Sequence, residues 1–364
     1  MCQTGDLQIN EGKPFGNIVL QSDYSEMIRL GFRPGDSVDV QFSSGAVIED
    51  IPFLSGCILP EGMLCLNAHE SFDWIRVEKR FGCAWELFPG GEEETGRVVL
   101  REAQKYADLY QAFTADFSID RADFPSDEFF ANYRPLSGGQ IQEGRFYRST
   151  ASFDPDSSIA EFRNREKLLD RLIERDGIRL IINMTCGREQ MTELFESGDY
   201  AGSYAEKLYK EGRIFSDLFP VDFTEAPFRD LLAAALRLML KCGGPVLIQC
   251  KAGVDRTGFF CGLMEALAGA DASEIRDDYM QSYECLYGMK RETDREKYDI
   301  LCKYQADRIL DIIAKNGASD NLSGAAEKYL EGCGLATDEI AELKALLTGA
   351  GGFRDEHADG KGES

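Results

Sequence analysis

The stretch PVLIQCKAGVDRTGFFCGL, residues 245–263, decides the fold of the second half of this chain. Its first five residues form a short apolar run directly after two glycines, which predicts a buried strand. Residues 259–269 form a second apolar run, long enough for a helix. The nine residues between the two runs, 250–258, are therefore expected to lie where a buried strand turns into a helix.

A loop in this position is suited to bind an anion. Its backbone N–H groups can point toward one centre, and the first turn of the following helix adds the positive end of its dipole. Gly253 permits the backbone conformation that such a loop needs, and Gly258 lets the helix begin close to it. The residues expected to bind a phosphoryl group are Lys251, Ala252, Gly253, Val254, Asp255 and Arg256.

Cys250 is the expected nucleophile of this loop. The thiolate is the reactive form of cysteine, and a helix N-terminus and a neighbouring arginine both favour it. Arg256 lies six positions further on, where its planar guanidinium can hold two phosphoryl oxygens. The hydroxyl of Thr257 is expected to donate to the sulfur when the cysteine leaves phosphorus. Because phosphoryl transfer needs mainly positioning and charge stabilisation, these residues imply hydrolysis of a phosphomonoester through a phosphocysteine.

Length and charge limit the class of protein. The chain has 364 residues, of which 43% are hydrophobic, and this is enough for two globular domains. Its 64 acidic and 40 basic residues give a net charge of −24. Such a surface repels nucleic-acid phosphates and anionic lipid headgroups, so we expect no nucleic-acid partner and no stable membrane association.

The cysteines and histidines limit the chemistry. Eleven cysteines spread from Cys2 to Cys333 without close pairing, and the N-terminus has no basic patch followed by an apolar run. Both features predict a cytoplasmic protein with reduced thiols. The two histidines, His69 and His357, are too few for a His-based zinc site or a Ser/His/Asp site, and we expect no metal and no cofactor.

The N-terminal third has the pattern of a β-rich domain. Short apolar runs alternate with turn residues from about residue 13 to 100. Residues 37–42 place Val38, Val40 and Phe42 on one face and polar side chains on the other, as in a half-buried strand. We therefore expect a small β-rich accessory domain over residues 1–125.

Beyond residue 125, helical and strand-like runs alternate. An amphipathic run at 159–175 precedes the apolar runs at 178–183 and 245–249, and helical patterns follow. This alternation predicts an α/β domain over residues 126–350, with a central, largely parallel sheet flanked by helices. Residues 351–364 are too polar to pack and predict a disordered tail.

The loop resembles the phosphate-binding loop of the protein tyrosine phosphatase superfamily, which has a Cys, five residues, an Arg and then Ser or Thr. Residues 252–258 resemble the bacterial tyrosine/lipid phosphatase branch, in which an Asp precedes the Arg. The stretches NYRPLSGG at 132–139 and GRFYRS at 144–149 are similar to the N-terminal motif of that branch, and residues 325–347 to its C-terminal helical pair. The resemblance covers about residues 128–348 and implies a tyrosine-phosphatase-like fold.

The resemblance implies a phosphorylated protein, above all phosphotyrosine, or a small phosphomonoester as substrate. Phosphoinositides or inositol phosphates are the alternative substrates. Val254 stands where relatives that accept phosphoinositides often have Lys, which favours phosphotyrosine. Gln249 stands where relatives have His and carries no positive charge. Gln249 therefore motivates a second hypothesis, a pseudophosphatase that binds phosphorylated partners with little turnover.

Two residues are candidates for the general acid. A leaving alkoxide or phenoxide needs a proton from an acid. In the resembled branch the loop Asp, here Asp255, is implicated, and we prefer it. Asp222 in the stretch FPVDF, 28 residues before Cys250, is the alternative, because many superfamily members carry the acid on a mobile upstream loop.

A second resemblance concerns the N-terminal region. The short motifs FGN at 15–17, GDSV at 35–38 and IPF at 51–53 resemble the C-terminal β-domain of the S-adenosylmethionine hydroxide adenosyltransferases. This resemblance implies a type of fold and no activity. An accessory or interface role is expected.

Overall fold

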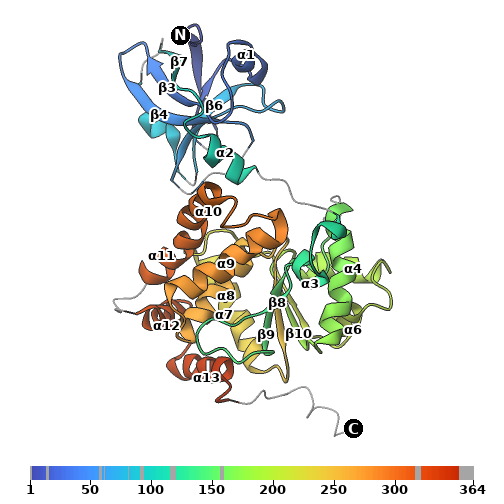
Figure 1. The fold of residues 1–364 in the computed structure, drawn as a ribbon. Coiled ribbons are helices and arrows are strands. Elements are labelled where there is room, and N and C mark those ends of the chain that lie inside the picture. Colours follow the sequence, from blue (N-terminus) through green and yellow to red (C-terminus); the bar gives the residue numbers. More distant parts are fainter. Residues whose placement is uncertain are drawn as a thin grey trace. The chain divides into compact units, whose positions relative to one another are not determined.

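A computed structural model describes residues 2–13, 16–56, 60, 62–80, 82–90, 94–114, 120–155, 160–315 and 321–351. The chain divides into two compact units (Figure 1). The first comprises Met1–Asp116 and Asp294–Tyr304, and the second Phe117–Thr293 and Gln305–Ser364. The predicted disordered tail, apart from its first residue, lies outside the described residues.

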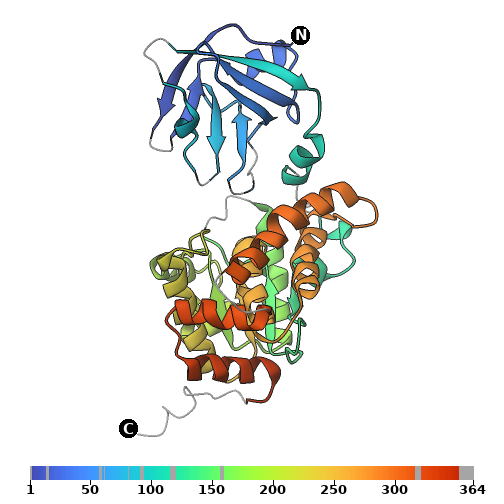
Figure 2. The same cartoon turned by 90° about the vertical axis from the view of Figure 1, so that its left-hand side faces the viewer.

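The described part of the first unit is a closed seven-stranded barrel with the strand order β1-β2-β6-β5-β4-β3-β7. Its strands curve around one apolar core (Figure 2). Neighbouring strands are antiparallel, except that β4 and β5 are parallel. The elements of the barrel are β1 (Leu7–Gly12), β2 (Asn17–Leu20), α1 (Tyr24–Arg29), β3 (Ser37–Phe42), β4 (Val47–Leu54), β5 (Leu64–Asn67), β6 (Ile75–Lys79), the 3-10 turn Ala84–Leu87, β7 (Thr95–Glu102) and α2 (Ala107–Phe113).

Strand β3 confirms the expected alternation with one exception. Val38, Val40 and Phe42 lie in the barrel core, as predicted. Ser37 is also buried, although a polar residue at this position was expected to face solvent. Its hydroxyl donates to Asp50 Oδ1 at 2.7 Å, and this bond replaces the lost contact with water.

The first unit takes in a second segment of chain. Helix α10 (Arg295–Leu301) packs against α2. A wide π-helical turn at Cys302–Ala306 then separates α10 from α11 (Asp307–Lys315). The division between the two units falls within this turn.

The second unit contains a five-stranded sheet with the order β11-β10-β12-β9-β8. The first four strands in this order are mutually parallel, and β8 joins the edge antiparallel. Strands β10 and β12 are buried along their whole length, as expected where both faces of a sheet are covered. The strands are β8 (Arg134–Pro135), β9 (Phe146–Ser149), β10 (Leu180–Asn183), β11 (Ile214–Ser216) and β12 (Val246–Gln249).

Helices cover the sheet on both faces, which confirms the mixed α/β class. In Figure 1, α4 and α6 lie on one side of the strands, and α7 and α8 on the other. Helix α8 is buried almost throughout, because other helices pack around it. The helices are the 3-10 turn Arg121–Asp123, α3 (Asp127–Phe130), α4 (Ala160–Arg175), α5 (Arg188–Glu196), α6 (Tyr204–Lys210), α7 (Ala226–Leu240), α8 (Asp255–Leu267), α9 (Ala272–Tyr287), α12 (Leu322–Gly332) and α13 (Thr337–Thr348).

The sheet order fixes where a ligand can bind. Strand β12 lies between β9 and β10, so the carboxyl ends of these parallel strands meet at one edge. Ligands of open α/β sheets bind at this edge. In the described ranges, no helix is both long and apolar enough to span a bilayer, and no cysteine forms a disulfide.

Glu265 is an unexpected charge in the middle of α8. Its side chain is fully buried, and neither carboxylate oxygen has a hydrogen-bond partner among the described residues. Burial raises the pKa of Glu265 well above its ordinary value, and the negative charge of Asp278 adds to this. Burial therefore favours the protonated form of Glu265 in the folded state.

We predict that Glu265→Met stabilises the second unit more at pH 8 than at pH 5. A carboxyl group with a raised folded pKa contributes stability below its unfolded pKa, and this stability is lost as pH rises toward the folded value, by up to about 1.4 kcal/mol per pH unit. Methionine has no such proton to lose. Far-UV circular dichroism of urea unfolding measures the difference.

Tryptophan fluorescence supplies the control for this experiment. Both tryptophans, Trp74 and Trp85, lie in the barrel unit, so their signal reports on the part of the chain that Glu265 does not touch. A stability gap between variant and wild type that is constant from pH 5 to pH 8 would contradict the prediction.

Candidate active site

The loop at residues 250–254 follows β12 at the carboxyl edge of the sheet. Three of its backbone carbonyls accept hydrogen bonds from residues outside the loop. The carbonyl of Lys251 accepts a hydrogen bond from the N–H of Ala151 at 3.2 Å. The next carbonyl, of Ala252, accepts from Asn132 Nδ2 at 3.2 Å. Two successive peptide units of the loop are thus fixed by residues that follow β9 or precede β8.

The third carbonyl, of Gly253, has two donors. Arg148 Nη2 on β9 lies 2.8 Å from it, and Asn132 Nδ2 lies 3.3 Å from it. In a trans peptide unit the C=O and the following N–H point in opposite directions. Because the three carbonyls point outward, the N–H groups of residues 252, 253 and 254 point to the inner side of the loop.

These inward N–H groups form a concave set of donors. Among the residues that the structure describes, none accepts a hydrogen bond from the backbone N–H of Ala252 or Gly253, and none outside α8 accepts from Val254. Successive N–H groups in such an arrangement, followed directly by a helix N-terminus, bind anions. Binding of a phosphoryl group by residues 251–256 stays a prediction.

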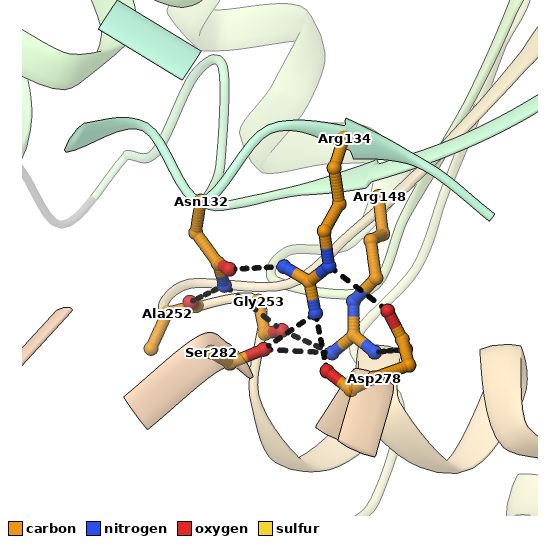
Figure 3. A network of polar contacts seen from close by, with 7 residues as sticks. All are labelled: Asn132, Arg134, Arg148, Ala252, Gly253, Asp278 and Ser282. Atoms are coloured by element: carbon orange, nitrogen blue, oxygen red, sulfur yellow. Dashed lines mark hydrogen bonds and ion pairs between the residues drawn. The ribbon is translucent and has the colours of Figure 1, made fainter. Parts of the chain in front are cut away.

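A buried polar network holds the donors in place (Figure 3). Asp278 on α9 accepts from Arg134 Nε at 2.9 Å and also pairs with Arg148. Arg134 donates to Asn132 Oδ1, and Ser282 Oγ lies within hydrogen-bond distance of both arginines. The two donors that bind the Gly253 carbonyl are therefore oriented by one helix.

The charges in this network favour an anion at the loop. Burial alone would raise the pKa of Asp278, but Arg134 and Arg148 outweigh burial and hold it below its ordinary value. Burial likewise disfavours the charged form of Arg148, yet Asp278 keeps the pKa of Arg148 above its ordinary value. Two arginines against one carboxylate leave one net positive charge behind the loop, where screening by water is weak.

Two residues, one in the loop and one that binds a loop carbonyl, have left-handed backbone conformations. Gly253 has φ +68°, and a Cβ on it would lie 2.3 Å from the carbonyl oxygen of Ser149. Asn132 has φ +51°, which asparagine tolerates better than most residues. A glycine is thus required at residue 253 both by conformation and by space, as the sequence predicted.

Arg256 lies at the carboxyl edge of the sheet. Its Nη1 donates to the carbonyl of Met184, which follows β10, and lies 3.5 Å from the carbonyl of Phe219, which follows β11. The side chain thus reaches across the ends of two strands that neighbour the loop. Its expected bidentate hold on a phosphoryl group stays a prediction.

Cys250 and Thr257 are both buried at the two ends of the loop. Cys250 is 3% exposed, and Thr257 is fully buried. The hydroxyl of Thr257 has no hydrogen-bond partner among the described residues. The expected bond from Thr257 to the sulfur stays a prediction.

Gln249 has a role in packing that the sequence analysis did not foresee. Its side chain is fully buried, and its Oε1 accepts from the N–H and the hydroxyl of Ser152, at 3.0 and 2.9 Å. Its Nε2 donates to Asn183 Oδ1 on β10 at 3.2 Å. Gln249 therefore ties β12 to β10 and to the chain after β9, and every polar atom of its amide group has a partner.

The two candidate acids lie in different settings. Asp255 is exposed in the first turn of α8, and its Oδ1 accepts a hydrogen bond from Tyr279 Oη at 3.0 Å. Asp222 lies between β11 and α7, where its Oδ1 accepts from the N–H and the hydroxyl of Thr224, at 2.9 and 2.6 Å. Asp255 thus directly follows the loop, whereas Asp222 caps a turn of its own segment.

A cavity of about 320 Å³ lies among α4, the chain after β9 and the segment between α5 and α6. Asp154 lies in its wall, and one of its carboxylate oxygens is 3.8 Å from Lys251 Nζ. Three further carboxylates, Glu166, Asp170 and Asp199, line the same cavity with Lys167 as the basic residue. The cavity is therefore acidic, and no residue of the loop lines it. Within the described ranges, no group of three or more His, Cys, Asp or Glu side chains is arranged to hold a metal ion.

Sequence analysis assigned no role to the residues that support the loop. Asn132, Arg134 and Arg148 lie in the two N-terminal motifs quoted above, but their partners Asp278 and Ser282 are more than 120 residues away in the chain. The signal in the sequence was the presence of Arg134 and Arg148 in these two motifs. A buried arginine needs a carboxylate partner, and the sequence alone does not show which carboxylate that is.

The fold and the loop together define a class of site: a cysteine-containing loop with inward N–H groups between a parallel strand and a helix. The comparisons agree with this class. Residues 188–349 match the model of the tyrosine phosphatase family, which confirms the superfamily resemblance. A tyrosine-protein phosphatase of Nostoc commune is 32% identical over 130 residues, which cover 32% of this chain and 43% of that protein. The chain thus spans less than half the length of this curated relative.

Two solved structures give weaker matches. TpbA of P. aeruginosa is 16% identical, with a TM-score of 0.27 over 54% of this chain and 93% of that one. The core catalytic domain of the PP-IP phosphatase SIW14 from S. cerevisiae is 22% identical, with a TM-score of 0.27 over 51% and 92% of the two chains. No comparison tests the resemblance of the N-terminal region to the adenosyltransferases, which stays a prediction.

We predict that Gly253→Ala weakens binding of vanadate, a phosphate analogue, by at least about tenfold. The new Cβ meets the Ser149 carbonyl in a left-handed conformation that costs an L-residue about 1–2 kcal/mol, so the loop must move and its N–H groups lose their common direction. Calorimetric titration measures the affinity.

Gly269→Ala is the matched control for this prediction. Gly269 also has a positive φ, +89°, but a Cβ there would meet nothing within 4 Å. This variant is expected to lose some stability and to keep its affinity for vanadate. Equal losses of affinity in the two variants would show that backbone strain, and not the loop, sets the binding.

Proposed function

We propose that this chain is a cysteine-dependent phosphomonoester hydrolase, acting above all on phosphotyrosine. The observation that carries the proposal is the outward binding of three successive loop carbonyls, which leaves the opposite N–H groups for an anion next to Cys250. The match of residues 188–349 to the tyrosine phosphatase family supports the same activity.

In the first step, the Cys250 thiolate attacks phosphorus. The sulfur–phosphorus bond forms while the bond from phosphorus to the leaving oxygen breaks, and the general acid gives its proton to that oxygen. The N–H groups of residues 252–254 and the guanidinium of Arg256 are proposed to hold the three phosphoryl oxygens. Fixed donors of this kind stabilise the charge that develops in the transition state.

In the second step, water attacks the phosphocysteine. The carboxylate left after the first step takes a proton from this water, and the phosphorus–sulfur bond breaks to give phosphate and thiolate. The hydroxyl of Thr257 is proposed to donate to the departing sulfur, since it is fully buried in the first turn of α8 without another partner among the described residues. The mechanism uses only side chains and backbone of this chain.

Asp255 is our candidate for the general acid. It follows the loop directly, and its exposed carboxyl group is fixed on one side by Tyr279. Asp222 is the alternative, but both of its recorded bonds hold the turn at Thr224. The different surroundings of the two carboxyl groups support Asp255.

Val254 supports phosphotyrosine over the alternative substrates. Inositol polyphosphates and phosphoinositides carry several phosphates, which additional basic residues in the loop would attract. Val254 adds no positive charge to the loop.

A phosphate-reading pseudophosphatase is the second candidate. Gln249 motivates it, because a buried neutral amide adds no positive charge behind Cys250. A protein of this kind would keep the anion site and lose the turnover. Turnover above a Cys250→Ser control separates the two functions.

We also propose a division into three parts: an accessory domain of residues 1–125, a phosphatase domain of 126–350 and a tail of 351–364. A bacterial source is proposed as well. A cytoplasmic location is also proposed. The high acidic charge supports the expected lack of nucleic-acid and membrane partners.

The central prediction concerns Cys250→Ser. Because the thiolate is the proposed nucleophile, this variant is expected to hydrolyse a phosphotyrosine peptide at least about 1,000-fold more slowly than wild type. A panel with inositol polyphosphates and phosphoinositides should give wild-type rates well below the peptide rate. Isothermal titration with inorganic phosphate checks that the variant retains its loop. Retained hydrolysis in Cys250→Ser would rule out the mechanism.

Asp255→Asn and Asp222→Asn form a matched pair of variants. If Asp255 is the acid, Asp255→Asn lowers kcat/KM for phosphotyrosine by about 100-fold or more, because general acid catalysis contributes about that much. Asp222→Asn should stay within about fivefold of wild type. Steady-state kinetics on a phosphotyrosine peptide measures kcat/KM for both variants. A larger loss in Asp222→Asn than in Asp255→Asn would identify Asp222 as the acid.

A further inference from the structure

Tyr279 is the partner of the proposed general acid. Its hydroxyl donates to Asp255 Oδ1 at 3.0 Å, and its side chain is only 2% exposed. Burial raises the pKa of Tyr279 well above its ordinary value, and the neighbouring Tyr283 and Asp255 add to this. The hydroxyl therefore remains protonated and can only donate to the carboxylate.

The ring of Tyr279 is tightly packed. A Cβ placed on Gly258 would lie 2.5 Å from both Cδ2 and Cε2 of the ring, so α8 and α9 meet here without a side chain between them. On the other side, the ring lies 6.0 Å from that of Tyr283, which stacks on Tyr287 at 5.5 Å. Gly258 is therefore needed for the close packing of α8 against Tyr279 as well as for the start of the helix.

The same turn of α9 also supports the phosphate loop. Asp278, the residue before Tyr279, orients Arg134 and Arg148, and Arg148 binds the Gly253 carbonyl. Helix α9 thus holds the loop through one residue and the adjacent Asp255 through the next. A carboxyl group and a phosphate site that must act together are positioned by one rigid element.

The hydrogen bond decides which oxygen of Asp255 can carry the acidic proton. Oδ1 accepts from Tyr279, so in the protonated acid the proton lies on Oδ2. A fixed carboxyl plane with a defined proton position is what proton transfer to a bound leaving group requires.

We propose that Tyr279 is a positioning residue for general acid catalysis: it fixes the carboxyl group of Asp255 so that Oδ2 delivers the proton to the leaving oxygen. This inference rests on the proposed phosphatase function. As the sulfur–phosphorus bond forms and the phosphorus–oxygen bond breaks, the proton passes from Asp255 Oδ2 to the leaving phenoxide. Tyr279 keeps its own proton throughout.

The test uses Tyr279→Phe in the full chain, which removes the hydroxyl and keeps the ring against Gly258. Two substrates are compared: phosphotyrosine, whose leaving phenoxide is strongly basic, and 4-nitrophenyl phosphate, whose leaving group needs much less protonation. The expected fall in kcat/KM is about tenfold or more for phosphotyrosine and less than about threefold for 4-nitrophenyl phosphate. The inhibition constant of vanadate, which reports on the loop alone, should change less than about twofold.

Two further variants complete the design. Tyr133→Phe also removes a buried tyrosine–aspartate hydrogen bond, the 2.8 Å bond to Asp176, and is expected to leave both substrates unaffected. In an Asp255→Asn background, adding Tyr279→Phe should cause no further fall for phosphotyrosine, because the proton that Tyr279 positions is already gone.

The outcomes separate the inference from the function on which it rests. Equal falls for both substrates, weaker vanadate inhibition, or no fall at all in Tyr279→Phe would each overturn the role of Tyr279 while leaving the phosphatase in place. Absence of Cys250-dependent hydrolysis by wild type would overturn the proposed function itself, and the role of Tyr279 with it.

Discussion

The hydrogen bonds from Asn132 and Arg148 to the carbonyls of Ala252 and Gly253 are the constraint on which the site depends. A peptide unit cannot turn its N–H inward unless its C=O turns outward, and a buried outward C=O needs a donor. Arg148 on β9 and Asn132, two residues before β8, supply these donors. The conformation of the anion site is therefore fixed by residues on the outer side of the loop, which need not contact a substrate.

This arrangement also resolves an apparent conflict of charge. The chain carries a net charge of −24, yet the proposed site binds a phosphate. Arg134 and Arg148 are buried with one carboxylate, Asp278, so their surplus positive charge lies under the loop and is poorly screened. Burial raises the pKa of Glu265, whose negative charge would oppose that of the arginines, and so favours its neutral form. Local charge at short range outweighs the acidic surface.

Sequence patterns predicted the features that are local in the chain. The strand, loop and helix around Cys250 and the strand at residues 37–42 were predicted, because apolar periodicity and glycine positions encode them. Contacts such as Tyr279 with Asp255, or Gln249 with Ser152, were not, because they join side chains far apart in sequence whose pairing only the packed helices and strands determine. The seven-stranded closure of the barrel and the return of α10 to that unit belong to the same category.

The most direct measurement is alkylation of Cys250 by iodoacetamide, followed by peptide mass analysis with and without inorganic phosphate. The half-exposed Cys83 in the barrel serves as internal reference. If the loop N–H groups favour a thiolate and bind phosphate next to it, Cys250 reacts faster than Cys83 despite its burial, and phosphate slows Cys250 alone. A Cys250 that reacts no faster than Cys83, and whose rate phosphate does not change, would contradict the account.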